Sequence, residues 1–285
     1  MAALRDLVAD ELATPVDARV SAFAEAIAAK HAPASRAVLF YGSCLRQKQL
    51  EGLMLDFYLI VSDYRTTYGK SWLAAANRMI PPNVFYFEHD GLVAKYAVLS
   101  ERDFHRLNGP ETGSVSVWAR FAQPSRLVWA ADEQAKQRAI DAVSRAVPTL
   151  LAAAGRIEGK PVLDWWRRAL SLTYSVELRA ERKVGIGSVV DFEPERYERF
   201  AAAALKDLPQ GDQASWSRRR FEGKALSVVR LAKASATFAG GVDYIAWKIN
   251  RHAGADIVIK PWQRRWPLLA AISLLPRLLR SGAVR

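Results

Sequence analysis

Cysteine and long apolar runs are scarce in this chain of 285 residues. The single cysteine, Cys44, excludes an internal disulfide framework and a cysteine-rich zinc site, which is typical of proteins in a reducing compartment. No stretch has the roughly 18 to 20 continuous apolar residues that a helix needs to cross a bilayer. Acidic residues at positions 6, 10 and 11 are unlike a signal or transit peptide. We therefore expect a cytoplasmic protein whose mature chain begins at Met1.

Histidines are few, and acidic residues are few in the last quarter of the chain. The four histidines, at positions 31, 89, 105 and 252, share no spacing, so we assign none of them to a site. Residues 216–285 contain 14 Lys and Arg against three acids, and they account for nearly all of the net charge of +12. Such a field attracts phosphate groups, whether of nucleic acid or of anionic lipid.

Hydrophobic residues make up 51% of the chain, enough for a sizeable core, and its length favours two domains with a boundary near residues 155–160. Apolar spacing predicts helices over residues 5–30 (divided at Pro15), 72–79, 133–154, 161–182 and, with an interruption, 217–252. Strands are predicted over residues 37–41, 53–61, 84–87 and 92–99. Asp90-Gly91 joins the last two strands, which favours a hairpin.

The pattern with chemical meaning is a buried strand that ends in Gly42-Ser43, followed by a second strand that contains Asp56. Backbone N–H groups at a small-residue turn before a helix can bind phosphate oxygens, and the serine hydroxyl adds a donor. A carboxylate on the neighbouring strand can hold magnesium against the same phosphates. The alternative is a plain tight turn beside an edge-strand or capping acid. Asp56 has large apolar neighbours on both sides, so its charge needs compensation, and a metal ion is one form of it.

These residues resemble the nucleotidyltransferases of the DNA polymerase β-like superfamily, whose motif is a hydrophobic strand, Gly-Ser, and a strand with Asp-x-Asp. In this sequence Tyr58 stands at the position of the second acid. Under this resemblance, Asp63 or another acid would supply the second metal ligand.

A narrower resemblance is to the peripheral, mitochondrial-type phosphatidate cytidylyltransferases, which make CDP-diacylglycerol from CTP and phosphatidate. It is strongest over residues 38–127. The matching motifs, in order, are Tyr41-Gly42-Ser43, Met54-Leu55-Asp56-Phe57 with Val61-Ser62-Asp63, Val84-Phe85-Tyr86-Phe87, Ala94-Lys95-Tyr96-Ala97-Val98, the altered elements Ala119-Arg120 and Gln123-Pro124, and Ser171 to Arg179. In that family the position of Tyr58 is usually not acidic.

The resemblance implies an α+β fold. A nucleotidyltransferase domain over residues 1–155 would have a small mixed sheet flanked by helices. A smaller, mainly helical domain of winged-helix character would follow over residues 156–255. A basic amphipathic tail over residues 256–285 would dock the protein on the inner face of the cell membrane.

The resemblance also implies roles for single residues, with CTP and phosphatidate as substrates and Mg²⁺ as cofactor. Gly42 and Ser43 would bind the triphosphate, and Asp56 would hold magnesium. Lys95 and Arg120 would neutralise phosphate groups of either substrate. The alternative for Lys95 is a solvent-facing position on an exposed strand.

The composition of the tail from Trp262 to Arg280 favours membrane docking independently of the resemblance. Its leucines occur at helical spacing and are bordered by arginines and tryptophans. A C-terminal helix packed on the core is the alternative. Two other functions also remain open. One is a nucleotidyltransferase that acts on nucleic acid or on a small-molecule hydroxyl, and the other is an inactive, membrane-associated nucleotide-binding protein. Because the lipid reading is favoured, we expect no nucleic-acid partner.

Overall fold

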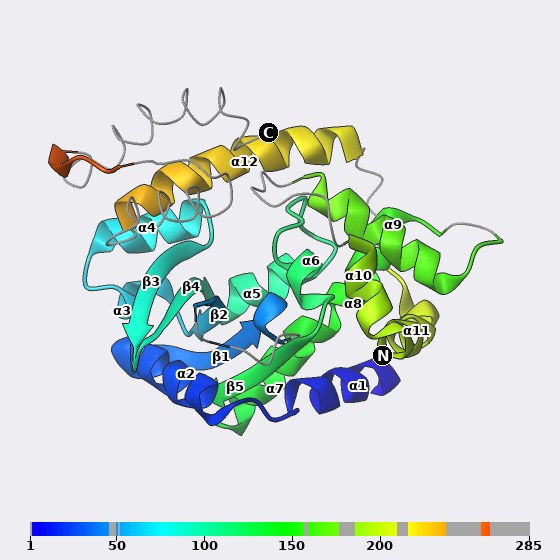
Figure 1. Cartoon of the computed structure of the whole chain (residues 1–285), viewed down its shortest axis with the longest axis horizontal. Coiled ribbons are helices and arrows are strands. Elements are labelled where there is room, and N and C mark those ends of the chain that lie inside the picture. The colour runs from blue at the N-terminus through cyan, green and yellow to red at the C-terminus, as the bar shows by residue number, and fades with distance from the viewer. Residues whose placement is uncertain are drawn as a thin grey trace.

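A five-stranded mixed sheet forms the centre of the computed structural model, with helices on both of its faces (Figure 1). The structure describes residues 2–45, 50, 52–156, 159–176, 186–209, 216–237 and 258–262. The strands are β1 (Ser35–Tyr41), β2 (Met54–Val61), β3 (Asn83–His89), β4 (Leu92–Ser100) and β5 (Ser125–Ala130). Their order is β3-β4-β2-β1-β5, in which β2 and β4 are parallel and every other pair is antiparallel. The chain is therefore an α+β protein, as predicted.

The predicted helices are present, with two differences in extent, and the helices over residues 64–67, 101–108, 118–121, 186–192 and 194–204 were not predicted. They are α1 (Ala2–Leu12), α2 (Ala18–Lys30), α3 (Tyr64–Thr67), α4 (Ser71–Met79), α5 (Glu101–Asn108), α6 (Trp118–Phe121), α7 (Glu133–Ser144), α8 (Ala146–Ala154), α9 (Val162–Tyr174), α10 (Ile186–Phe192), α11 (Pro194–Ala204) and α12 (Trp216–Thr237), with short 3-10 helices η1 (Ser43–Leu45) and η2 (Leu205–Asp207). Residues 133–154 form two helices instead of one, because Pro148 has no N–H to donate and fits the first turn of a new helix. The predicted helix over 161–182 ends at Tyr174, and residues 177–185 lie outside the described part.

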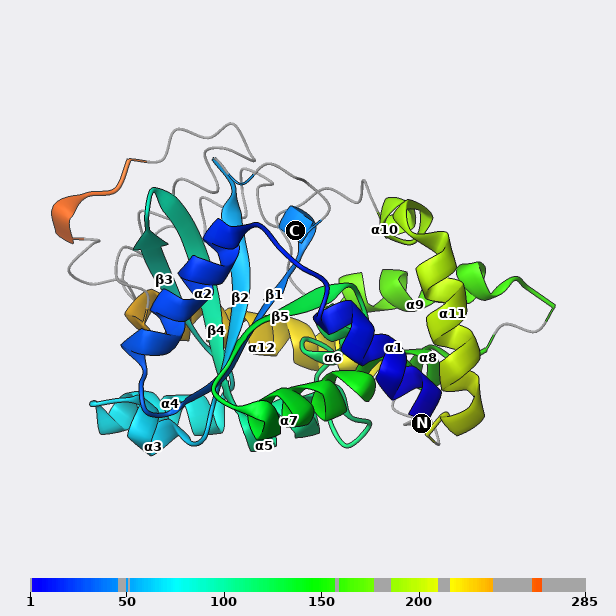
Figure 2. The same ribbon diagram turned by 90° about the horizontal axis from the view of Figure 1, so that it is seen from below.

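Side chains on the two faces of the sheet enter two separate cores. On one face, leucines and aromatics of β1, β2 and β4 pack against α2, α3 and α4. On the other face, the sheet packs against α1 and α5 to α11. Figure 2 shows α2 on one side of the strands and α12 crossing behind them on the other. Alternation along each strand thus decides which residues become core and which can form a site.

The second core runs without a break from the sheet into α8 to α11, past the predicted domain boundary. That boundary falls in the connection between α8 and α9, and the division into domains stays a prediction. Residues 159–176 and 186–209 are mostly helical, which agrees with the helical character expected there. Their winged-helix character stays a prediction as well.

The long helix α12 runs across the face of the molecule toward β3 and α4 (Figure 1). The sequence predicts helix as far as residue 252, and residues 238–257 lie outside the described part. The predicted membrane-docking tail also lies outside it, apart from residues 258–262. Among the described residues, no helix is both long and apolar enough to cross a membrane.

Candidate functional site

One row of side chains crosses all five strands at the end where β2 begins. Its members are paired neighbours in the register of the sheet, and in sheet order they are Tyr86, Lys95, Asp56, Tyr41 and Ser125. Paired residues project from the same face of the sheet. The row therefore forms a polar strip on the face that packs against α6. The row brings Asp56 and Lys95, two of the predicted site residues, to adjacent positions.

The next row along the sheet projects from the opposite face and is mostly aromatic. Phe85, Tyr96, Phe57 and Phe40 are paired neighbours there, and the first two stack with ring centroids 5.5 Å apart. This aromatic row fixes the register of the strands, because a shift of one residue would expose it and bury the polar row.

Asp56 and Lys95 form an ion pair at the centre of the polar row. The distance from Lys95 Nζ to Asp56 Oδ1 is 3.0 Å, and the side chains are 32% and 19% exposed. The pair supplies the compensation that a carboxylate between large apolar residues requires. Both side chains are partly exposed, although Asp56 Oδ1 itself is buried.

Gly42 places the backbone directly against this carboxylate. Its φ of +97° lies in the region that favours glycine, and a Cβ at this position would be 3.1 Å from Asp56 Oδ2. A side chain would therefore fill the space beside the acid. The sequence-based prediction that Gly42 and Asp56 lie together agrees with this geometry.

Ser43 follows Gly42 and is exposed, as the first residue of η1. The sequence predicts the start of a helix here, whereas the described residues form a 3-10 helix of three residues and residues 46–49 lie outside the described part. We therefore base nothing on a helix dipole at this point. Ser43 stays at the edge of the site through its place next to Gly42.

Tyr58, which stands at the position where the sequence comparison looked for a second acid, is a core residue. Its side chain is buried, and its ring lies 5.3 Å from that of Tyr41 and 5.1 Å from that of Phe121. Phe104 packs against the same rings. A carboxylate in this aromatic cluster would be costly, so the position has become part of the core.

Asp63 lies at the other end of β2 and caps α3. Its carboxylate accepts hydrogen bonds from the backbone N–H groups of Arg65 and Thr66 at 2.8 and 3.0 Å. Bonds from Thr66 hold the pKa of Asp63 below its ordinary value. A strand rises about 3.3 Å per residue, so the length of β2 from Asp56 to Val61 alone is roughly 16 Å. The structure does not bring Asp63 to Asp56, and we do not retain it as a ligand of the same metal ion.

Arg120 lies on α6, and its Nη1 donates to the carbonyl oxygen of Ser116. The next residue, Phe121, contacts Tyr41 and Tyr58, so α6 packs against the polar row while the Arg120 guanidinium is directed to the loop before the helix. The predicted role of Arg120 in binding phosphate stays a prediction.

Two members of the polar row are not among the predicted site residues. Tyr86 lies opposite Lys95, and its hydroxyl donates to Glu88 at 3.3 Å. Ser125 is fully buried, and its hydroxyl has no hydrogen-bond partner within the described part of the chain. Strand alternation could have pointed to Tyr86, because residues two apart in a strand, such as Val84 and Tyr86, project from the same face of the sheet. Ser125 could not, because β5 itself was not predicted.

Asp56 is the residue that could hold a divalent cation at this site. Magnesium keeps several waters and needs one or two protein carboxylates when substrate phosphates complete its coordination. The single carboxylate, with the Gly42 backbone close beside it, fits that manner of binding. Within the described residues there is no group of three or more His, Cys, Asp or Glu side chains arranged to bind a metal.

The chain matches no protein-family model and no curated protein sequence.

Proposed function

We propose that this chain is a magnesium-dependent nucleotidyltransferase. Its site would be formed by Gly42, Ser43, Asp56 and Lys95, at the end of the sheet where β2 begins. More particularly, we propose that it transfers the cytidylyl group of CTP to phosphatidate and releases CDP-diacylglycerol and pyrophosphate. The support for the class is the close approach of Gly42 to Asp56, combined with the ion pair of Asp56 and Lys95. The support for the particular substrates is the set of motifs that resemble the phosphatidate cytidylyltransferases.

The proposed reaction needs positioning and charge neutralisation more than proton transfer. An oxygen of the phosphatidate phosphate attacks the α-phosphorus of CTP, and the bond from that phosphorus to the bridging oxygen of pyrophosphate breaks. The attacking phosphate is already ionised, so no general base is required. Lys95 would neutralise phosphate charge, and the backbone at Gly42 and Ser43 would receive the triphosphate. A magnesium ion held by Asp56 would supply further charge neutralisation.

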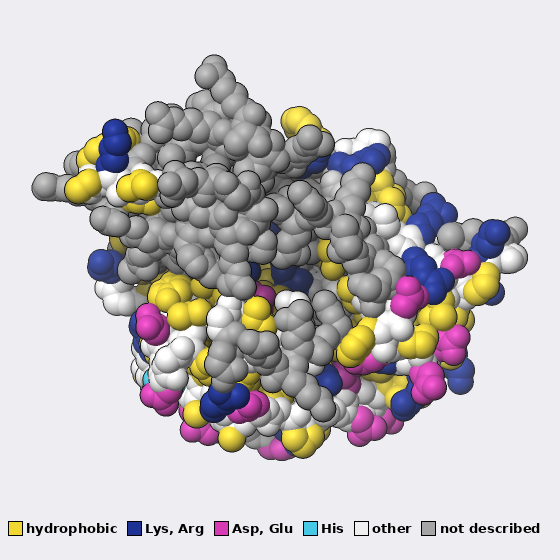
Figure 3. Space-filling model, in the orientation of Figure 1, with side chains coloured by type: hydrophobic (Ala, Val, Ile, Leu, Met, Phe, Trp, Pro, Cys, Tyr) yellow, Lys and Arg dark blue, Asp and Glu magenta, His cyan; other side chains and the backbone are white. Residues whose placement is uncertain are grey.

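A membrane surface is the proposed place of action. The exposed part of α12 includes Phe221, Val228 and Val229, and Arg218 and Lys224 are exposed on the same helix. Apolar side chains bordered by cations suit the boundary of an anionic bilayer. Figure 3 shows Lys and Arg side chains toward α9 and the start of α12, and both acidic and basic side chains along the lower rim.

Substitution of Asp56 tests the proposed site. We expect wild-type protein with magnesium to form CDP-diacylglycerol on phosphatidate vesicles from CTP in preference to the other three nucleotides. Asp56→Asn should lower turnover on the order of 100-fold or more, the scale of losing one preorganised electrostatic contact. Asp63→Asn is the matched control, and we expect it to keep turnover within about twofold because Asp63 caps α3. Equal turnover in the wild type and Asp56→Asn would contradict the site.

A second candidate function is nucleotide binding without turnover. It is favoured by the aromatic packing of Tyr58 and by the position of Lys95 Nζ against Asp56 Oδ1, where a metal ion would otherwise bind. Isothermal titration with CTP and magnesium separates the two candidates. Binding of CTP with no product from any of the four nucleotides would favour the second.

A further inference from the structure

His31 lies where α2, α3 and β4 meet, on the face of the sheet opposite the polar row. It follows the last residue of α2 as the C-cap, and it is partly exposed. Its Nε2 lies 2.9 Å from the hydroxyl oxygen of Tyr96 on β4, and its Nδ1 lies 3.5 Å from the carbonyl oxygen of Thr67 at the end of α3. One imidazole therefore joins three elements that are well separated in the chain.

Three aromatic rings pack against the imidazole. The ring centroids of Tyr96, Tyr68 and Phe85 lie 5.6, 6.3 and 6.3 Å from that of His31. Both tyrosines are buried, and Phe85 stacks on Tyr96 in the aromatic row of the sheet. Close packing of this kind restricts the directions that the imidazole can take, so each ring nitrogen keeps its own partner.

The two partners determine which form of the imidazole fits. A carbonyl oxygen can only accept a hydrogen bond, so the contact with Thr67 requires the hydrogen on Nδ1. In the neutral ring Nε2 is then an acceptor, and the hydroxyl of Tyr96 donates to it. The opposite tautomer would place the lone pair of Nδ1 against the carbonyl oxygen. One neutral tautomer thus satisfies both contacts.

Protonation of His31 breaks this match. A hydrogen on Nε2 would face the Tyr96 hydroxyl, whose oxygen would have to accept where it now donates. The hydroxyl hydrogen has no other acceptor within the described part of the chain, and Tyr96 is only 1% exposed, so water does not replace it. A buried donor without a partner is unfavourable, and the contact between α2 and β4 is therefore weaker in the charged form.

The groups around the ring favour the neutral form on balance. Burial lowers the pKa of His31 below its ordinary value, the Thr67 carbonyl acts in the opposite direction, and the Lys30 ammonium lowers the pKa further. The titratable groups that face the ring from α3 and β4 are Tyr68 and Tyr96, and burial raises the pKa of both, so they stay uncharged. The C-terminal end of α2 favours a cation. Within the described part of the chain, no carboxylate forms an ion pair with His31.

We propose that His31 is a pH-sensitive latch, which holds α2 and α3 to β4 while it is neutral and releases Tyr96 when it is protonated. Tyr96 directly follows Lys95 on β4, and the two side chains project from opposite faces of the sheet. The latch therefore lies behind the ion pair of Lys95 and Asp56, and acid loosens the support of that pair from the far side of the sheet. The inference does not depend on the reaction at the site.

Titration of the imidazole by NMR in the full chain tests the latch without a substitution in it. In the neutral ring of His31 we expect the hydrogen on Nδ1, and we expect a pKa below the ordinary 6.5. A neutral ring with its hydrogen on Nε2, or a pKa of 6.5 or above, would overturn the inference. Asp56→Asn should abolish nucleotidyl transfer and leave this titration unchanged, so this proposal and the proposed function can fail separately.

A double-mutant cycle of His31→Phe and Tyr96→Phe tests the contact itself, because both changes keep a ring and remove the polar atoms. Above the pKa that the titration gives, the two changes should be coupled by about 5-fold in the unfolding equilibrium constant, and below that pKa by less than about twofold. The control cycle uses Tyr86→Phe, whose hydroxyl lies on the other face of the sheet, and should show no coupling at either pH. Equal coupling of His31 and Tyr96 on both sides of the pKa indicates a purely structural contact and contradicts the latch.

Hydrogen exchange locates the release. The contribution of His31 to stability is complete above 6.5 and is lost as pH falls through its lowered pKa. Below that pKa, amides of α3 and of the last turn of α2 should exchange at least ~5-fold faster in the wild type than in His31→Gln, whose side chain offers an acceptor and a donor but does not titrate. Amides of β1 should exchange alike in both proteins, and they serve as the internal reference in the wild type if the variant does not fold. Protection of α3 that follows β1 at every pH would overturn the inference.

Discussion

Single residues at the edge of the sheet have narrow physical requirements. Gly42 combines a positive φ with a close approach to the Asp56 carboxylate, and a residue with a side chain meets neither condition. The charge of Lys95 on β4 is balanced by Asp56, which lies opposite it on β2 and far from it in sequence. The chemistry of the site thus depends on which residue lies opposite which in the sheet.

Substitution of Gly42 by alanine should be more harmful than the same change at Gly91. Both glycines have positive φ, +97° and +73°, but a Cβ at Gly91 would meet nothing within 4 Å. Each change should cost about 1 to 2 kcal/mol of stability through backbone strain. Gly42→Ala should lose more, because its Cβ also presses on Asp56 Oδ2. Urea unfolding measures both, and equal losses would contradict the close approach.

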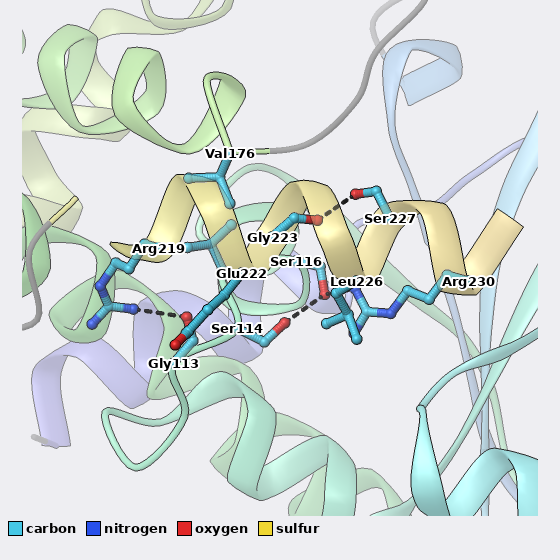
Figure 4. A pocket seen from close by; sticks show the side chains of 11 residues that line it. Gly113, Ser114, Ser116, Val176, Arg219, Glu222, Gly223, Leu226, Ser227 and Arg230 are labelled. Atoms are coloured by element: carbon cyan, nitrogen blue, oxygen red, sulfur yellow. Dashed lines mark hydrogen bonds between the residues drawn. The ribbon is translucent and has the colours of Figure 1, made fainter. Parts of the chain in front are cut away.

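Among the elements, α12 depends most on contacts that are distant in sequence. Its inner face lines a cavity of about 110 Å³ opposite the loop that precedes α6 (Figure 4). Its Lys233 ammonium donates to carbonyl oxygens near the start of β3. Burial, with a smaller effect of Arg230, lowers the pKa of Lys233 from its ordinary 10.5 to about 8. The contact of α12 with β3 is therefore sensitive to alkaline pH.

The lowered pKa of Lys233 predicts the direction of that sensitivity. Between pH 8 and 10.5, Lys233 of the unfolded chain still holds the proton that Lys233 of the folded chain has released. The contribution of Lys233 to the free energy of unfolding therefore rises with pH in this window and is lost as pH falls through 8. Lys233→Met removes the titration. Unfolding free energies of both proteins at several pH values should diverge in favour of the wild type from pH 8 upward. A constant difference would contradict the lowered pKa.

At the scale of the whole molecule, a buried ion pair joins the first helix to the helices beyond the sheet. Arg196 on α11 donates to both oxygens of Glu11 at the end of α1, at 2.6 and 3.0 Å, and the side chains are 9% and 11% exposed. Arg196 also donates to the carbonyl oxygen of Ala122 beside α6. This contact connects the sheet, α1 and α11 in one continuous core.

Loss of the Glu11 charge should therefore destabilise the whole molecule. Glu11→Gln leaves the buried Arg196 guanidinium without its counter-ion, which should cost about 3 kcal/mol. The control is Asp141→Asn, which breaks the pair that Arg5 of α1 forms with α7, whose side chains are 38% and 51% exposed. That pair should contribute less than about 1 kcal/mol. Thermal and urea unfolding test the contrast, and comparable losses would show that the Glu11 pair is solvated.

Local patterns were sufficient to predict four of the five strands and most of the longer helices, but not α3, α5, α6, α10 or α11. The runs that form β1, β2, β3 and β4 are apolar and bounded by turn residues, and Asp90-Gly91 joins β3 and β4 with positive φ at both residues. The strand β5 was missed, because residues 125–130 are partly exposed and follow a short helix. Strand pairing, not its own composition, makes this segment a strand.

The sequence by itself determined that Gly42 and Asp56 lie near each other, because two successive strands with a short connection between them return the chain to the same end of the sheet. Tertiary structure alone decided the rest. The parallel pairing of β2 with β4 places Lys95 on Asp56, the length of β2 separates Asp63 from it, and the aromatic cluster buries Tyr58. It also decided that α12 lies against the loop before α6 and encloses the cavity between them. Such contacts join residues far apart in the chain, and their geometry depends on packing that no local pattern encodes.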